Sequence, residues 1–181
     1  YRRQRQMCIR DRPEIIGELR SLKTLGISVC GLKKLPDSFC ALTQLEVLHL
    51  QDNDLSELPK DFGKLIKLRK LDLKGNKLIA LPESFTNLSL LKALLLSQNK
   101  LKILPRGIAK LQNLRVVDLW GNNLSAFPEE LCGLKELTTL ELWNNNIPSI
   151  PPEIQNFANL TQLNLGNNVL TSVPTEISRL K

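Results

Sequence analysis

The sequence predicts an α/β solenoid: a horseshoe arc of stacked repeats with a parallel β-sheet on its concave side and loops or short helical turns on its convex side. Three observations predict this fold class. Leucine, asparagine and proline recur every 23 residues, leucines alternate with other residues over a short stretch of each repeat, and the chain is 42% hydrophobic but only 4% aromatic. Such a period is typical of solenoids, in which no repeat buries its apolar residues alone and stacking creates one continuous core.

The repeats keep one register along the chain. A partial copy at residues 13–18 precedes the full copies and an eighth begins at Leu180, so we expect residues 13–181 to be a single domain and an interior part of a longer array. The seven full copies follow one another without an insertion, at residues 19–41, 42–64, 65–87, 88–110, 111–133, 134–156 and 157–179.

Each repeat predicts the same local structure. In the second full copy, Leu48 and Leu50 alternate, which predicts a short strand with both side chains in the core. Asn53 follows where the chain must turn, and a buried amide there can bond the backbone of its own turn and of the next. Pro59 lacks a backbone donor and suits the convex side, from which Phe62 fills the core. The predicted structural ladder comprises Asn53, Asn76, Asn99, Asn122, Asn145 and Asn168, with Cys30 in this position of the first full copy.

The pattern Leu-x-x-Leu-x-x-Leu-x-Leu-x-x-Asn-x-Leu-x-x-Leu-Pro-x-x-Phe, which begins at Leu42, resembles that of the leucine-rich-repeat superfamily. Its 23-residue form with Leu-Pro-x-x-Phe or Leu-Pro-x-x-Ile resembles the intracellular Ras-group repeats of Scribble- and Erbin-like scaffolds and of plant Ras-group proteins. The resemblance covers residues 13–181. It implies a protein-binding module whose partner is a small GTPase or a signalling enzyme.

Residues 1–12 do not fit the repeat. They hold five arginines and one aspartate, which is more than half of the net charge of +7. The stretch resembles a peptide that arises when sequencing-adaptor DNA is translated at the edge of an assembled transcript. We therefore expect a non-native, disordered leader and exclude it from the reasoning about fold.

Four columns of side chains should project from the concave face, because residues between buried leucines point outward, and two of these columns hold the candidate binding residues. The acid column comprises Gly26, His49, Asp72, Leu95, Asp118, Glu141 and Asn164, and the Trp column comprises Ser28, Gln51, Lys74, Ser97, Trp120, Trp143 and Gly166. The only two tryptophans occupy adjacent repeats and can stack side by side, with acids next to them, a composition typical of binding hot spots. The alternative is that the indoles only cover the sheet and each other. The predicted partner-binding residues are Trp120, Trp143, Asp118, Glu141, Asp72, His49 and Lys74.

The sequence does not favour catalysis, and we predict no catalytic residues, no metal site and no cofactor. Nucleotide-binding, zinc-protease and serine-hydrolase motifs are absent, and a lone histidine with four scattered cysteines does not make a zinc site. We predict no nucleic-acid partner, because residues 13–181 carry little net charge and acids rather than bases flank the tryptophans. No apolar run is long enough for membrane insertion, and the sequence leaves the oligomeric state open.

The function we predict is a cytoplasmic scaffold or adaptor module in intracellular signalling, with a protein partner on the concave face. Cysteines without clusters or disulfide caps favour a reducing compartment. One alternative is an extracellular recognition or adhesion array, which predicts a signal peptide, cysteine caps and glycosylation at Asn87, Asn123 and Asn159. The other is a regulatory segment of a larger kinase or GTPase whose catalytic domain lies elsewhere.

Overall fold

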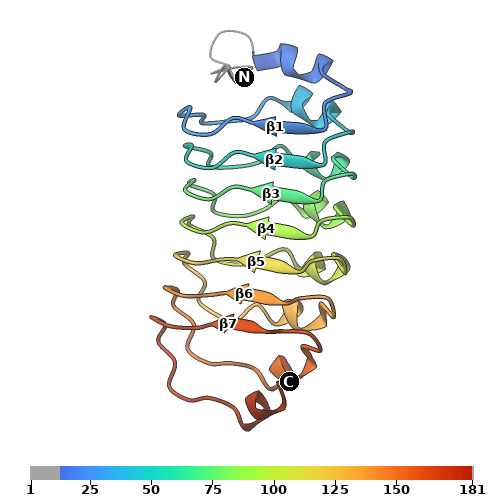
Figure 1. The fold of residues 1–181 in the computed structure, drawn as a ribbon. Helices are drawn as coiled ribbons and strands as arrows, with labels where there is room; N and C mark the ends of the chain where they lie inside the picture. Colours follow the sequence, from blue (N-terminus) through green and yellow to red (C-terminus); the bar gives the residue numbers. More distant parts are fainter. Residues whose placement is uncertain (1–12, 181) are drawn as a thin grey trace, which may run out of the picture.

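A computed structural model describes residues 13–180, and in this part of the chain seven short strands form one open, parallel sheet in chain order (Figure 1). This arrangement confirms the predicted solenoid. The strands are β1 (Thr24–Gly26), β2 (Val47–His49), β3 (Lys70–Asp72), β4 (Ala93–Leu95), β5 (Val116–Asp118), β6 (Thr139–Glu141) and β7 (Gln162–Asn164). The prediction for residues 1–12 lies outside the described residues.

One turn of 3-10 helix follows each strand on the opposite side of the stack, and another precedes β1. A proline precedes most of these helices in extended conformation, as at Pro36, Pro82 and Pro105, which fixes the entry of the chain. The helices are η1 (Pro13–Glu18), η2 (Asp37–Ala41), η3 (Phe62–Lys64), η4 (Glu83–Asn87), η5 (Arg106–Lys110), η6 (Glu129–Gly133), η7 (Pro152–Asn156) and η8 (Thr175–Arg179). In the described residues, no helix is long and apolar enough to cross a membrane.

The register of the sheet aligns the repeats without a slip. Leu48 pairs with Leu71, and His49 pairs with Asp72, one repeat apart. Because every strand keeps this offset, equivalent side chains fall into columns, as the 23-residue period predicts. The mainly aliphatic core fills the space between the sheet and the 3-10 helices, and two of its five phenylalanines, Phe62 and Phe85, stack with ring centroids 6.2 Å apart.

The asparagines form a continuous ladder behind the sheet. Asn99 accepts a bond at Oδ1 from the backbone N–H of Leu78 at 3.0 Å, and its Nδ2 donates to the carbonyls of Leu73 and Leu96 at 3.0 Å each. The prediction that each asparagine bonds the next repeat is therefore wrong. The bonds of Asn99 to Leu78 and Leu73 both run to the preceding repeat. The preceding turn presents the N–H of Leu78 and the carbonyl of Leu73 at this depth, and this carbonyl also accepts a 3.0 Å bond from Asn76 of its own turn.

A left-handed residue precedes each ladder position, where the chain turns away from the sheet. The φ angle lies between 51° and 64° at Val29, Asp52, Gly75, Gln98, Gly121, Asn144 and Asn167. Glycine and asparagine adopt this conformation at little cost, whereas a β-branched residue such as Val29 is strained. Cys30 follows Val29, and its Sγ donates to the carbonyl of Ser28 at 3.3 Å, so the thiol replaces one of the asparagine contacts.

Candidate functional site

The structure brings the seven predicted partner-binding residues together on the face of the sheet that lies opposite the 3-10 helices. His49 Nδ1 lies 3.9 Å from Asp72 Oδ2, and the other oxygen of Asp72 accepts a 3.2 Å bond from the Lys74 backbone. Asp118 and Glu141 are neighbours in the acid column. The residues thus make a band across repeats two to six.

A long ion pair ties the middle of this band together. Lys74 Nζ lies 3.0 Å from Asp118 Oδ2, although an entire repeat separates their strands. The repeat between them places Ser97 in the Trp column, and this small side chain is covered almost completely. Asp118 is also nearly buried, and its other oxygen accepts a 3.2 Å bond from the Trp120 backbone. The charge of Asp118 is therefore compensated by Lys74, which the sequence pattern did not reveal.

The two indoles meet at an angle. Their ring centroids are 5.7 Å apart and their planes are inclined by 41°, so they are tilted rather than stacked side by side. Trp143 is 38% exposed, whereas Trp120 is more deeply covered, and its buried Nε1 has no acceptor among the described residues. Packing rather than hydrogen bonding therefore sets the position of Trp120.

Gly166 makes room for the outer indole. A Cβ at this position would lie 2.6 Å from Trp143 Cδ1, closer than real side-chain contacts allow. Gly166 belongs to the Trp column of the next repeat, so the indole of Trp143 lies over a position that carries no side chain. Any larger residue there must move the ring.

Glu141 is the second acid beside the indoles. Its Oε1 accepts a 2.6 Å bond from Gln162 Nε2, and no lysine or arginine of residues 13–180 forms an ion pair with it. Asp118, Trp120, Glu141, Trp143 and Asn164 line a shallow hollow of about 340 Å³. The hollow combines aromatic faces, one unpaired carboxylate and one amide.

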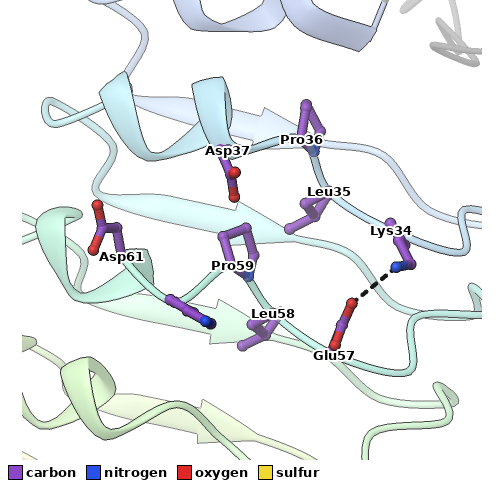
Figure 2. A pocket seen from close by; sticks show the side chains of 9 residues that line it. Lys34, Leu35, Pro36, Asp37, Glu57, Leu58, Pro59 and Asp61 are labelled. Atoms are coloured by element: carbon purple, nitrogen blue, oxygen red, sulfur yellow. Dashed lines mark ion pairs between the residues drawn. The ribbon is translucent and has the colours of Figure 1, made fainter.

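A larger groove of about 820 Å³ lies between repeats one and two on the convex side (Figure 2). Leu35 and Leu58 are among its lining residues, and Lys34 and Glu57 form a 3.1 Å ion pair at one side. On the side away from this groove, η3 packs closely against η4. Gly63 lies so close to the Ser84 carbonyl that a Cβ would overlap it, and Ser84 Oγ accepts a bond from the Gly63 N–H. The repeat pattern of the sequence does not predict this groove.

No group of three or more metal-ligating side chains occurs within residues 13–180. Burial raises the pKa of the Cys40 thiol to about 11, with contributions from Asp61 and Asp37. Burial likewise raises the pKa of Cys132 to about 12, with contributions from Glu153 and Glu129. Thiols with raised pKa are poor nucleophiles at neutral pH, so these two cysteines act as core residues.

Comparison with known proteins is consistent with this architecture. The model of a leucine-rich repeat region matches residues 47–143, which is more than half of the chain, and a model of two leucine-rich repeats matches residues 135–178. A search of curated proteins finds no match.

Several solved structures are similar. A leucine-rich-repeat protein of Leptospira interrogans is 30% identical over 93% of this chain and 49% of its own, with a TM-score of 0.73. The leucine-rich-repeat ectodomain of the Arabidopsis thaliana membrane receptor kinase GASSHO1/SCHENGEN3, solved in complex with CASPARIAN STRIP INTEGRITY FACTOR 2, is 32% identical over 91% of this chain and 21% of its own, with a TM-score of 0.83. An internalin from Listeria monocytogenes, at 23% identity and a TM-score of 0.78, shares the fold.

The chain therefore spans about half of the Leptospira protein and about a fifth of the plant ectodomain. The comparisons do not distinguish the Ras-group subtype, which stays a prediction. The repeat pattern, the parallel sheet, the asparagine ladder and the matching family model lead to one conclusion: this chain belongs to the leucine-rich-repeat family.

Proposed function

We propose that this protein is a protein-binding module whose concave face captures a protein partner through Trp143 and the residues around it. The observation that carries the proposal is an exposed tryptophan held over Gly166 beside a hollow that is lined by Glu141 and Asn164. Tryptophan is one of the residue types in which the hot spots of protein–protein interfaces are enriched.

The rigidity of the face supports the same function. Each strand is fixed by its neighbours and by the asparagine ladder, so the concave side chains are arranged before a partner arrives. A preorganised surface loses less conformational entropy on binding than a flexible one. The plant ectodomain, which is 32% identical to this chain, was solved in complex with CASPARIAN STRIP INTEGRITY FACTOR 2, so a related array of repeats binds another molecule.

The finer part of the proposal is a cytoplasmic scaffold in signalling, with a small GTPase or a signalling enzyme as partner. It depends on the Leu-Pro-x-x-Phe form of the repeat, which resembles the intracellular Ras group. The absence of catalytic motifs in the sequence supports a binding role rather than a catalytic one.

A second candidate is recognition outside the cell, as part of a receptor. Its support is the similarity to the ectodomain of a membrane receptor kinase. The asparagines of two Asn-x-Ser sequences, Asn87 and Asn123, are exposed and accessible to glycosylation in a secreted chain. The full reading frame separates the two candidates, because a signal peptide or a membrane anchor in it would favour the second.

Site-specific photo-crosslinking in cells that express the protein tests the binding role. A benzophenone side chain at Thr139 lies on the concave face in β6, and the same group at Lys110 lies on the convex side at the end of η5. We expect a discrete crosslinked protein from position 139 only, and its loss when Trp143→Ala is added. Equal yields from both positions, or a yield that Trp143→Ala does not change, would contradict the proposal.

Stability measurements provide the control for this experiment. Trp143→Ala should leave the melting temperature nearly unchanged, because the side chain lies at the surface. Leu96→Ala should cost roughly 2–5 kcal/mol of stability, because Leu96 is fully buried. A large drop in the melting temperature of Trp143→Ala would show that the indole is structural.

A further inference from the structure

We infer that the hollow at Trp143 and Glu141 receives an arginine side chain of the partner. This inference rests on the proposed function and names the chemistry that the site recognises. It follows from three properties of the hollow: a carboxylate without an ion-pair partner, a partly exposed indole and a spacing that fits a guanidinium.

The first property is charge. Of the two acids in the hollow, Asp118 already pairs with Lys74 at 3.0 Å. Glu141 has only the neutral amide of Gln162 as a partner within the described residues. A hollow with one compensated and one uncompensated carboxylate attracts a single cation.

The second property is the aromatic surface. Trp143 is 38% exposed, and on the side of the next repeat its ring packs against the backbone of Gly166 rather than against a side chain. A cation within about 6 Å of an indole centre is attracted by the negative face of the ring. Trp120 supports the ring from the other side, so Trp143 does not have to reorder to accept a ligand.

The third property is spacing. Glu141 and Trp143 are two residues apart and project from the same face, which places them about 7 Å apart along the chain. A guanidinium is planar and carries several N–H donors, so it can lie on the indole while it donates to the Glu141 carboxylate. An ammonium is a strongly hydrated point charge and uses the ring less well, so the geometry favours arginine over lysine.

The Lys74–Asp118 pair predicts a second effect on ligand binding, opposite in sign to that of neutralising Glu141. Lys74 is a cation of the protein itself that already occupies one carboxylate of the hollow. When Lys74 is replaced by glutamine, Asp118 becomes available to the ligand as well. A site that binds a guanidinium should therefore weaken when Glu141 is neutralised and strengthen when Lys74 is neutralised.

The probe is N-acetyl-arginine methylamide, titrated into the full 181-residue chain at constant ionic strength, with the neutral citrulline analogue and the lysine analogue in parallel. Both tryptophans of the protein line the hollow, so tryptophan fluorescence, excited selectively over Tyr1, and the two indole N–H resonances report on this site. We expect a saturable change with the arginine compound, a smaller response with the lysine compound and none with the citrulline compound.

Three variants complete the test. Glu141→Gln should weaken binding of the arginine compound about 10-fold, as is typical for the loss of a charge-assisted contact. Glu153→Gln, which removes the same charge from η7 on the convex side, should leave binding unchanged. Lys74→Gln should tighten binding, and a thermal melt of each variant confirms that it is folded.

The inference is overturned if the citrulline compound binds as well as the arginine compound, if the lysine compound binds more tightly, or if Glu141→Gln has no effect. It is also overturned if none of the three compounds changes the tryptophan fluorescence or the indole N–H resonances up to the highest concentration at which the compounds dissolve. If crosslinking at Thr139 still depends on Trp143 in that case, the proposed function stands and only the nature of the ligand is wrong.

Discussion

Lys74 reaches across one complete repeat to place its Nζ 3.0 Å from Asp118 Oδ2. The intervening position of the Trp column is Ser97, whose small and almost completely covered side chain does not fill the space between the two charged groups. In solenoids, contacts are expected mainly between adjacent repeats. This ion pair therefore adds a link between repeats three and five to the stability that stacking provides.

Lys74→Met should lower the free energy of unfolding by about 1 kcal/mol, because it leaves the nearly buried Asp118 carboxylate without its cation. The matched control is Lys34→Met, whose partner Glu57 is exposed together with Lys34 at the convex groove (Figure 2). Urea unfolding of both variants measures the difference. Equal effects would show that the long pair contributes no more than a surface ion pair.

Asn99→Ala should destabilise the protein by roughly 2–4 kcal/mol, because the N–H of Leu78 and the carbonyls of Leu73 and Leu96 lose a buried partner. The control is Asn113→Ala. The exposed amide of Asn113 donates to the carbonyl of Ser89, so its loss should change the free energy of unfolding little. Equilibrium unfolding in urea compares the two. A small loss in Asn99→Ala would mean that water replaces the ladder bonds.

Gly63→Ala should destabilise the protein by about 1–3 kcal/mol, because its methyl group would overlap the Ser84 carbonyl and force η3 away from η4. Gly133→Ala in η6 serves as the control, since its nearest neighbour is the Ala109 Cβ at an ordinary 3.7 Å. Thermal melts compare the melting temperatures of the two variants. Similar melting temperatures would show that η3 adapts without cost.

Val29→Asn should stabilise the protein by about 1 kcal/mol, because Val29 has a φ of 57° that asparagine adopts more easily. Its side chain is exposed, so the change removes little packing. The control is Val169→Asn, which removes another exposed valine at a position without positive φ. This variant should not increase the free energy of unfolding. If both variants behave alike in urea unfolding, relief of backbone strain is not the cause.

The buried thiols predict a loss of stability at high pH. The pKa of Cys40 is raised to about 11 and that of Cys132 to about 12, from an ordinary value of 9.0. Above pH 9 the unfolded chain releases these protons while the folded chain retains them, so deprotonation stabilises the unfolded state. The free energy of unfolding should therefore be unaffected by these groups below pH 9 and should fall from there toward pH 11.

The measurement is urea unfolding between pH 7 and 10.5 for the wild type and for Cys40→Ala/Cys132→Ala. The double variant should lose less stability over this range, since it lacks both thiols, and lysine and tyrosine titration affects both proteins alike. Parallel curves would show that the thiols ionise as easily in the folded chain as in the unfolded one.

The candidate site was only partly predictable. The columns followed from the period, so the proximity of Trp120 to Trp143 and of Asp118 to Glu141 was accessible from residue numbers. The pairing of Lys74 with Asp118 could not be predicted from residue numbers, because it depends on how far one lysine extends past the intervening repeat. The tilt of the indoles likewise depends on the space that Gly166 leaves, which no spacing rule encodes.

The sequence by itself determined the fold, because a 23-residue period of leucines has one way to bury every apolar column, and that way is a parallel stack. It also determined which residues share the concave face. The tertiary structure decided the direction of the asparagine bonds, which carboxylate is paired and which is available, and where the convex groove opens. These features arise from side-chain reach and from packing between repeats, and both depend on distances that exist only after the chain has folded.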